Sequence, residues 1–479
     1  FFQSCVSMAR TRLKFYSCLL IYRQYSVSNI CCSYPKLTPA QATAILKTNE
    51  FTKELESGGS VKGFDLNVLP SNNPVEDKHA IAKCLLTTGI LCGVFDGHGG
   101  SACAEVVAKR ALSYVAAGLL SPNLLEKYLQ ALRDGFEEKD SFKLIEYFND
   151  ELILSSELNS IFDKSYADYL EYLNGKVASR EDFQMSDAMI TAFTKLDEHM
   201  GEETLSSHSQ SVYKELLSVA LSGCVACVAH IDGPHLHIAS TGDCGAVLGA
   251  EGEGGAWMAK KLTDEHNYEN YDEVKRILSE HPQSENHTIL RNERLFGQLA
   301  PLRAFGDFRY KWDKKTIEEV LVPASGLMML PPHYHTPPYL TATPSITYHR
   351  LTAKDKFLVL ASDGLWDQMS PSQVVRLIGE HMSGRVTLTP LSLPRKPLTL
   401  GDIEEILVQR RKGLAKKPID VNGATHLIRN AIGGTEYGLE HTRLSQMLTL
   451  PDEIVRVFRD DITIIIIYFD SKYLRNCRF

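Results

Sequence analysis

Apolar positions along this chain fall into two patterns, short runs of strand length and longer stretches with helical spacing. The final run, residues 462–469, consists mainly of isoleucine and aromatic residues, which favours a buried strand. Residues 101–120 instead repeat apolar side chains at helical spacing, which predicts an amphipathic helix packed on a sheet. The other strand-like runs cover residues 72–95, 218–231, 235–240, 246–248, 339–350 and 356–361.

Two further helices are predicted from their first residues. Thr38-Pro39 and Ser370-Pro371 each precede an apolar stretch with helical spacing. Serine and threonine cap helix N-termini, and proline is favoured in the first turn. The glycine-rich residues 249–255 are expected to form a hairpin or surface loop. Because strands and helices do not alternate regularly, the pattern favours an α+β domain over a doubly wound sheet, with strand ends gathered at one edge.

Composition narrows the class of protein. The chain has 479 residues, of which 44% are hydrophobic and 23% charged, as is usual for a globular protein. This length admits several domains or one large domain with insertions. The formal net charge of -8 gives no general reason to bind nucleic acid or an anionic membrane. The apolar run 462–469 is too short to span a bilayer, so we expect no transmembrane segment.

The first 35 residues differ in charge from the rest of the chain. No acidic residue precedes Glu50, whereas arginine, lysine and serine are frequent there. This composition is typical of an organellar transit peptide, and we expect residues 1–35 to be one. The alternative is a disordered basic tail.

The cysteines show no spacing typical of a disulfide framework or a zinc site. We interpret them as reduced, mostly buried side chains in a reducing compartment. Cys224 and Cys227 could form a redox pair, but on a strand two residues three positions apart face opposite sides.

Acidic residues mark the ends of several predicted strands. Asp96-Gly97-His98 follows the run 89–95 and places a carboxylate, a backbone carbonyl and an imidazole together. Magnesium and manganese bind such oxygen ligands. Each aspartate alone is more simply a cap or turn residue, but their repetition at strand ends favours a shared metal site. The acidic residues in these positions are Glu76, Asp77, Asp96, Asp243, Asp363, Asp460 and Asp461.

Motifs for other hydrolytic chemistries are missing from the sequence. It contains no zinc-like Cys/His cluster, no Gly-x-x-x-x-Gly-Lys phosphate loop and no Gly-x-Ser-x-Gly elbow. Two metal ions that share a carboxylate would activate a bridging water and clamp a phosphoryl group for in-line attack. The residues therefore favour hydrolysis of a phosphate ester over acyl transfer.

The order of the motifs resembles that of the metal-dependent Ser/Thr protein phosphatases, the PPM family. The resemblance covers roughly residues 66–469. It implies a central β-sandwich of two antiparallel sheets flanked by helices, with the metals at one end. The motifs are Glu76-Asp77, Phe95-Asp-Gly-His-Gly-Gly100, Thr241-Gly-Asp243, Leu262-Thr-x-x-His266, Arg303-Ala-Phe-Gly-Asp307, Ala361-Ser-Asp-Gly-Leu-Trp-Asp367 and Arg459-Asp-Asp-Ile-Thr463.

The resemblance also implies roles for single residues. Asp96 would bridge two Mg²⁺ or Mn²⁺ ions, one of which would also bind the Gly97 carbonyl. Asp363 and Asp460 would bind the other ion. His98 would be the general acid that protonates the departing serine oxygen, and the alternative is a histidine that only stabilises the loop.

Other implied roles are weaker. Glu76 would act mainly through metal-bound water with Asp77 beside it, and Asp243 together with Asp363 could hold a third ion. Many family members bind the substrate phosphate with an arginine where Asn72 stands here. A neutral amide cannot make the charge-assisted, bidentate contact of a guanidinium. Phosphate binding must then depend on the metals or on another basic residue.

A second departure from the family pattern follows Asp243, and two residues of another motif are not assigned to catalysis. Cys244-Gly245 replaces the usual Ser-Arg after Asp243, and metal binding should survive because the aspartate remains. Arg303 and Asp307 are expected to be structural.

Within the family, residues 36–39, 331–340, 425–429 and 459–464 are similar to the pyruvate dehydrogenase phosphatases of the mitochondrial matrix. This implies the phosphorylated alpha subunit of pyruvate dehydrogenase as substrate, docking on the acyltransferase core and its lipoyl domains, and room for a regulatory subunit. Two alternatives stay open, a non-catalytic scaffold and a phosphatase for another phosphoprotein.

The expected division of the chain follows from these assignments. Residues 36–470 form the phosphatase domain and residues 471–479 a C-terminal tail. Insertions near 121–215 and 384–450 would provide the docking surface or merely extend the scaffold.

Overall fold

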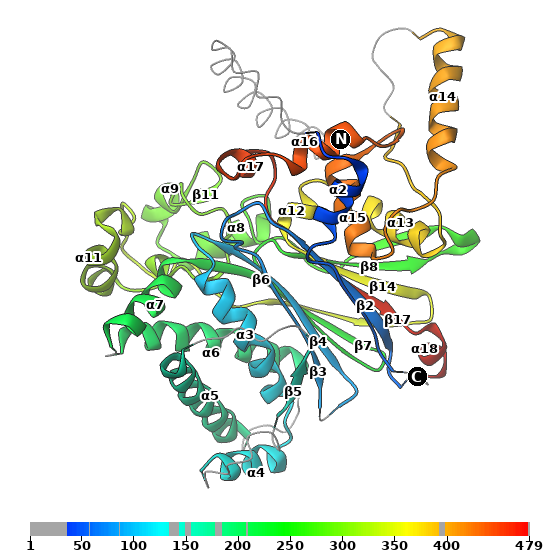
Figure 1. Ribbon diagram of the computed structural model, residues 1–479. Helices are drawn as coiled ribbons and strands as arrows, with labels where there is room; N and C mark the ends of the chain where they lie inside the picture. The colour runs from blue at the N-terminus through cyan, green and yellow to red at the C-terminus, as the bar shows by residue number, and fades with distance from the viewer. Residues whose placement is uncertain are drawn as a thin grey trace, which may run out of the picture.

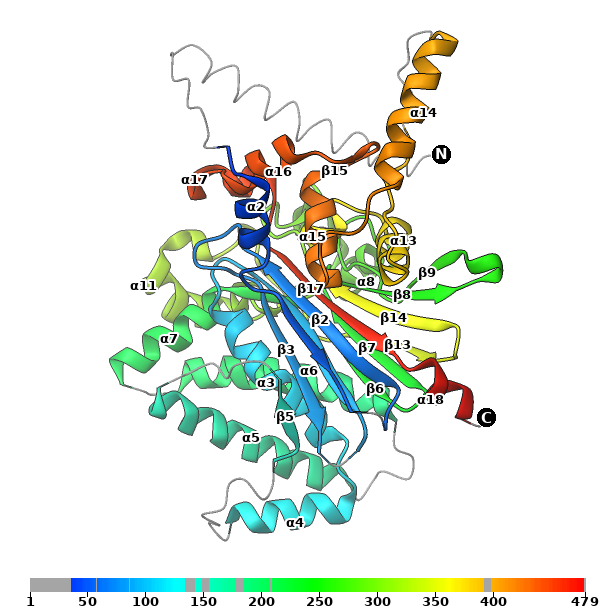
Figure 2. The same cartoon turned by 45° about the vertical axis from the view of Figure 1, so that its right-hand side comes forward.

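The computed structural model describes residues 36–477 except 57, 86, 134–142, 149–154, 178–183, 207–208 and 392–397. The expected transit peptide, residues 1–35, lies outside the described residues. Two antiparallel sheets stack face to face, and helices cover both outer faces (Figures 1 and 2). This arrangement confirms the predicted α+β fold with a central β-sandwich.

The first sheet has β17 near its centre, buried on both faces. Ile465 and Ile467 of β17 belong to the core between the sheets, whereas Ile464 and Ile466 pack under the outer helices. This double burial explains why the last run of the sequence is apolar without alternation. In spatial order the strands are β1 (Phe51–Glu54), β2 (Val61–Leu69), β17 (Ile462–Phe469), β14 (Asp355–Ala361), β8 (Gly245–Glu251) and β9 (Trp257–Lys261).

Two strands of the second sheet begin later than the sequence pattern predicts. The strand expected from residue 218 starts at Gly223, because the preceding residues complete helix α7 and pack on the core from there. The strand expected from residue 339 starts at Ser345. The strands are β13 (Ser345–Arg350), β7 (His235–Thr241), β6 (Gly223–Asp232), β4 (Ile90–His98), β3 (Lys78–Cys84) and β5 (Ile145–Tyr147), with β12 (Phe305–Gly306) beside β6.

The helices over the second sheet are held together by a buried ion pair. The Arg110 guanidinium of α3 donates to Glu203 Oε1 and Oε2 of α6 at 2.7 and 2.9 Å, and Ser165 of α5 also donates to Glu203. The prediction of a helix over 101–120 is confirmed by α3. The helices of this layer are α3 (Ala102–Gly118), α4 (Pro122–Arg133), α5 (Ser156–Val177), α6 (Met185–Leu205) and α7 (Gln210–Leu221).

Two helices over the first sheet begin where the sequence predicts. Thr38 and Ser370 each form a capping box at the start of α2 and α13. Helix α14 projects away from the body (Figures 1 and 2). The helices on this side are α2 (Pro39–Leu46), α12 (Asp363–Trp366), α13 (Pro371–Met382), α14 (Leu400–Leu414), α15 (Gly423–Gly433), α16 (His441–Leu448) and α17 (Asp452–Phe458).

Smaller elements complete the fold. Gly254 and Gly255 have positive φ in the β8–β9 connection, which confirms the hairpin expected at 249–255. The remaining elements are η2 (Glu253–Gly255), α8 (Tyr271–Glu280), η3 (Gln283–Glu285), α9 (Asn286–Ile289), β10 (Leu290–Arg291), β11 (Arg294–Leu295), η4 (Phe308–Tyr310), α10 (Lys314–Thr316), η5 (Ile317–Leu321), α11 (Val322–Ser325), η6 (Leu327–Met329), β15 (Gly434–Thr435), β16 (Gly438–Leu439) and α18 (Ser471–Asn476).

The two expected insertions contain helices that belong to the body of the domain as well as the projecting helix α14. Helix α6 lies within 121–215 and α15 within 384–450, yet both contribute residues to the hydrophobic core.

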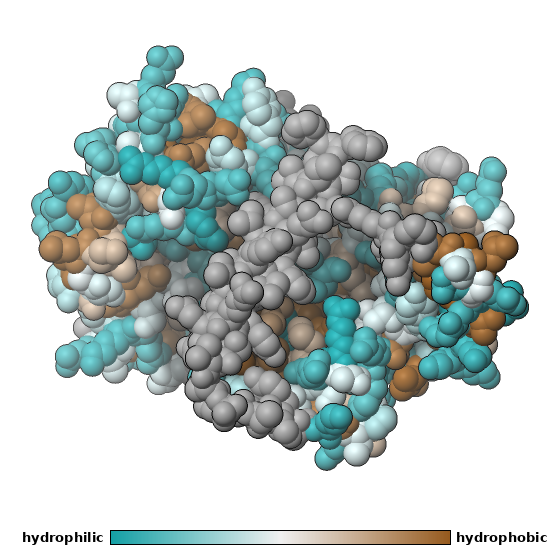
Figure 3. Space-filling model, turned by 90° about the horizontal axis from the view of Figure 1, so that it is seen from above, coloured by the Kyte–Doolittle hydropathy of each residue, from teal (hydrophilic) through white to brown (hydrophobic). Residues whose placement is uncertain are grey.

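The view from above shows separate apolar patches among polar side chains (Figure 3). Leu327, Leu400 and Val421 are exposed large apolar side chains. None of the helices in the described part of the chain is long and apolar enough to cross a membrane.

Replacing Arg110 with Met is expected to lower the free energy of unfolding by about 3–5 kcal/mol, because the Glu203 carboxylate would stay buried without its guanidinium partner. Urea denaturation followed by circular dichroism measures this change. Arg385→Met is the matched control, since Arg385 is exposed and pairs with Glu380 at 2.6 Å. The control should change stability by less than about 1 kcal/mol. Equal effects of the two substitutions would contradict a stabilising role for the buried pair.

Candidate active site

The antiparallel sheets bring acidic residues from distant parts of the chain to one end of the sandwich. Asp363 comes just after β14 and Asp460 just before β17, and these two strands pair antiparallel in the first sheet. In the second sheet, β4 continues through Asp96 and Gly97 to His98. The predicted strand ended before Asp96, whereas the observed strand includes all three residues because they pair with β6.

Burial and the charges of neighbouring carboxylates raise the pKa values of four aspartates in this region. Burial raises the pKa of Asp96 well above its usual value, and the charges of Asp77 and Asp363 raise it further. Burial also raises the pKa of Asp77 to about 7 and that of Asp243 to about 6. The pKa of Asp363 is raised by burial and then by the charges of Asp243 and other aspartates, including Asp460. A bound cation would relieve this repulsion.

The donor set fits a hard divalent cation with part of its hydration shell. Among the described residues, no three His, Cys, Asp or Glu side chains are close enough to enclose an ion. The carboxylates of Asp77, Asp96, Asp243, Asp363 and Asp460 therefore form an open cluster, which we call the acidic group. Mg²⁺ commonly binds one or two carboxylates and keeps several waters, so an open group suits it. Gly97 lets the strand approach the preceding loop, because a Cβ there would lie 2.6 Å from the Glu76 carbonyl.

Asp461 organises the loop before β3. Its Oδ1 accepts hydrogen bonds from the backbone N–H of Ser71 and Asn72 at 2.5 and 2.8 Å, and its Oδ2 accepts one from Glu76 at 2.9 Å. The Asn72 amide donates to Asp460 and Asp461 at 3.3 and 3.0 Å. The side chain of Asn72, expected near the substrate phosphate, is thus engaged by neighbouring carboxylates. Sequence reasoning grouped Asp461 with the acidic residues but assigned it no role.

Glu76 and Asp77 connect separate parts of the site. Glu76 Oε1 accepts a hydrogen bond from the Gly100 N–H at 2.7 Å, which holds the loop after His98. Asp77 Oδ2 accepts one from the Ser362 hydroxyl at 2.7 Å. Because Ser362 directly precedes Asp363, this bond links the Glu-Asp pair to the turn after β14.

His98 has a partner that sequence reasoning treated as structural only. His98 Nε2 lies 2.5 Å from Asp307 Oδ2. Burial alone would lower the pKa of His98, but the charge and hydrogen bond of Asp307 raise it above 6.5. A Cβ at Gly223 would overlap both side chains, so glycine is required where they pack. Asp307 therefore positions His98, and no sequence spacing could show a contact between residues 209 positions apart.

The unusual Cys244-Gly245 pair has a structural explanation. Cys244 is buried, and a Cβ at Gly245 would lie 2.7 Å from Trp366 Nε1. The Trp366 indole donates to the Ala361 carbonyl at 2.9 Å. Asp243 directly precedes this packed pair.

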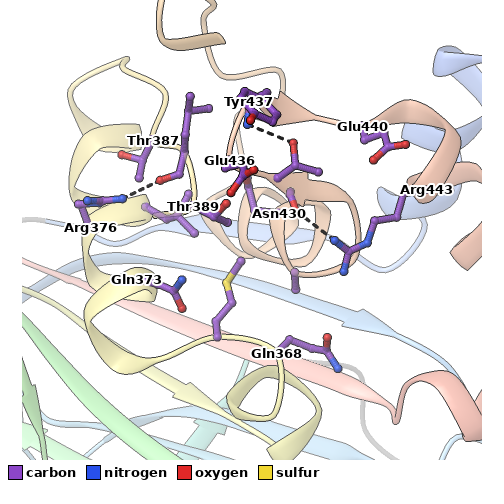
Figure 4. A pocket seen from close by; sticks show the side chains of 16 residues that line it. Gln368, Gln373, Arg376, Thr387, Thr389, Asn430, Glu436, Tyr437, Glu440 and Arg443 are labelled. Atoms are coloured by element: carbon purple, nitrogen blue, oxygen red, sulfur yellow. Dashed lines mark hydrogen bonds between the residues drawn. The ribbon is translucent and has the colours of Figure 1, made fainter. Parts of the chain in front are cut away.

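A separate cavity of about 520 Å³ lies between α13, α15 and the β15–β16 hairpin. Arg376, Thr387, Glu436 and Arg443 project around it (Figure 4), and Arg376 donates to the Leu388 carbonyl at 2.7 Å. None of the predicted site residues lines this cavity. The acidic group therefore lies apart from it.

The class of protein follows from the fold, the acidic group and a family comparison. The model of the family described as protein phosphatase 2C matches residues 154–393, a range that includes Asp243 and Asp363. The chain belongs to this family of metal-dependent protein phosphatases.

Individual relatives narrow the class further. The chain is 41% identical over 94% of its length to the human protein named pyruvate dehydrogenase (acetyl-transferring)-phosphatase 1, mitochondrial, and covers 86% of that protein. The corresponding human phosphatase 2 is 41% identical over 91% of this chain, with 84% of that protein covered. A protein phosphatase 2C homolog of Schizosaccharomyces pombe is 32% identical over 90% of this chain, with 85% of that protein covered. The names of the two human relatives support a mitochondrial location.

Without metal, the buried carboxyl groups should make stability depend on pH. The folded-state pKa of Asp77 is about 7 against 3.8 for the free group, so the folded protein keeps a proton that the unfolded chain loses. Its contribution is present below pH 3.8 and is lost as pH rises through about 7. In EDTA, the Tm of Asp77→Asn relative to wild type should therefore increase over this range.

Differential scanning calorimetry measures this difference, with the exposed Asp272→Asn as control. Mg²⁺ at neutral pH should raise the Tm of wild type more than that of Asp77→Asn. A Tm difference independent of pH would contradict a raised pKa at Asp77.

Replacing Asp307 with Asn should lower the pKa of His98, because the variant loses the charge that favours the imidazolium. An NMR titration of the metal-free protein with labelled histidine measures this pKa. Asp355→Asn is the control, since Asp355 lies 3.3 Å from a different histidine, His349. A pKa of His98 that does not change in Asp307→Asn would show that the contact does not govern its protonation.

Proposed function

We propose that this chain removes phosphate from phosphoserines on the alpha subunit of pyruvate dehydrogenase, which reactivates the complex. The substrate assignment is supported by 41% identity over 94% of the chain to a relative named for this activity. The observation that carries the hydrolytic assignment is the convergence of Asp96, Asp243, Asp363 and Asp460 at one end of the sandwich, where burial and the charges of Asp243 and Asp460 raise the pKa values of Asp96 and Asp363.

The same residues suit two Mg²⁺ or Mn²⁺ ions. When bound, the ions would supply an activated water and neutralise the phosphoryl oxygens. In our proposal, Asp96, the Gly97 carbonyl, Asp363 and Asp460 would hold the two ions. Asp243 together with Asp363 would hold a third ion more weakly.

The remaining groups of the site orient the reactants. Asp307 engages His98 Nε2, which leaves Nδ1 as the ring nitrogen that can hold a proton for the departing serine oxygen. The raised pKa of His98 keeps the imidazole protonated to higher pH, as a general acid requires. Glu76 and Asp77 act through water, and their hydrogen bonds to Gly100 and Ser362 fix their orientation.

We also propose a location and partners for this chain. The location is the mitochondrial matrix, a proposal supported by the absence of acidic residues before Glu50 and by the word mitochondrial in the names of the relatives. We propose that segments 121–215 and 384–450 dock on the acyltransferase core or its lipoyl domains, and that a regulatory subunit can bind there. The projecting helix α14 supports a docking role for the second segment.

The test is phosphate release from phosphorylated pyruvate dehydrogenase in Mg²⁺ or EDTA. Wild type should release phosphate only with Mg²⁺. Asp363→Asn should lower the rate by about a hundredfold or more, because it removes a charge that binds the cation. The exposed Asp272→Asn should behave as wild type.

The two alternative functions give different results in this assay. A scaffold would release no phosphate from any substrate. A phosphatase for another phosphoprotein would cleave a small aryl phosphate but not phosphorylated pyruvate dehydrogenase. Activity in EDTA, or an unaffected Asp363→Asn variant, would contradict the metal-dependent mechanism.

A further inference from the structure

An exposed arginine lies at the rim of the acidic group, on the short helix α17 just before Asp460. Arg456 Nη1 is 3.1 Å from Glu76 Oε2. The Arg456 side chain is 52% exposed, whereas that of Glu76 is 11% exposed. The guanidinium therefore covers a mostly buried carboxylate and faces solvent on its other side.

The other cationic groups described around this loop are engaged by protein atoms. Arg459 is buried and donates to the Pro70 carbonyl at 2.7 Å and to the Ser71 hydroxyl. Lys78 Nζ donates to the Val75 carbonyl at 2.7 Å. Among the cationic side chains that the described structure places against residues 70–78, Arg456 is the one that is mostly exposed.

Helix α17 is tied to this loop on both sides of Arg456. Asn73 donates to Asp452 at 3.2 Å near the start of the helix. Arg459, directly after the helix, donates to Pro70. These contacts tie both ends of the helix to the loop that carries Glu76, while the Arg456 side chain stays half exposed. The guanidinium is thus held within reach of whatever binds over the acidic group.

We propose that Arg456 binds the phosphoryl group of the substrate, and that it exchanges Glu76 for a phosphoryl oxygen when substrate arrives. The inference rests on the proposed phosphatase function, since a phosphomonoester dianion is its substrate. Because the guanidinium is half exposed, it can leave Glu76 without itself becoming buried, and it can bind phosphate oxygens in bidentate fashion. Arg456 is then the cation that Asn72 cannot supply.

The competing explanation is that Arg456 only positions Glu76. The two roles differ in what they change. Loss of phosphate binding raises KM and the inhibition constant of inorganic phosphate, whereas a disturbed Glu76 changes the Mg²⁺ concentration needed for activation.

The test compares wild type, Arg456→Gln, Arg456→Lys and the control Arg385→Gln, which removes another exposed arginine paired with a glutamate. Calorimetric titration with inorganic phosphate in Mg²⁺ requires no turnover and gives Kd. Steady-state kinetics on phosphorylated pyruvate dehydrogenase and a small aryl phosphate give kcat and KM.

Arg456→Gln should weaken phosphate binding and raise KM by about ten- to a hundredfold, the loss expected for a charged hydrogen-bonded contact, with a smaller effect on kcat. Arg456→Lys should be intermediate because it keeps the charge but not the fork of donors. Arg385→Gln should match wild type. Equal melting temperatures for the variants would confirm that they fold.

Unchanged phosphate binding in Arg456→Gln would overturn the inference, as would a change confined to Mg²⁺ activation. A wild type that binds phosphate but releases none from any substrate would contradict the proposed function. In that case the inference would stand if Arg456→Gln still weakened phosphate binding. A wild type that does not bind phosphate would overturn the inference directly.

Discussion

Repulsion among buried carboxylates is the constraint on which the rest of this site depends. Asp77, Asp96 and Asp363 each have a pKa raised by burial and by the charges of neighbouring aspartates. Groups in this state cost folding free energy unless a proton or a cation lies between them. The surrounding structure must therefore hold them in place against a force that would separate them.

Hydrogen bonds to the backbone and the packing of the core keep these carboxylates in place. Asp461 accepts hydrogen bonds from four backbone N–H groups of the loop before β3, and Ser362 ties Asp77 to the turn after β14. Gly364 lets the turn after β14 lie directly against the residue before β17, because a Cβ at position 364 would overlap the Asp461 carbonyl oxygen. Beneath this end of the sandwich, β17 is buried on both faces, so its start cannot shift without disturbing both hydrophobic layers.

Local sequence signals predicted most of the elements but few of the contacts between distant residues. The capping boxes at Thr38 and Ser370 are local, and the structure has both. The order of motifs pointed to the sandwich and to the acidic residues at one end. The pairing of His98 with Asp307 and of Glu76 with Arg456 could not be predicted, because each joins residues brought together only by the complete fold. Apolar periodicity also failed at residues 219–221, which pack on the core from a helix rather than from a strand.

The acidic group creates a second electrostatic problem, which concerns the substrate. The carboxylates that attract metal ions also repel a phosphate dianion, so a positive charge is needed that does not itself compete for the cation positions. An arginine at position 72 would lie directly beside Asp460 and Asp461, where the neutral Asn72 amide now donates to both. A cation on α17 is half exposed and pairs with a single glutamate, Glu76. In this arrangement the inner carboxylates remain available to metal, and the outer guanidinium remains available to the incoming phosphate. The neutral residue at position 72 and the exposed charge at position 456 together separate metal binding from phosphate binding.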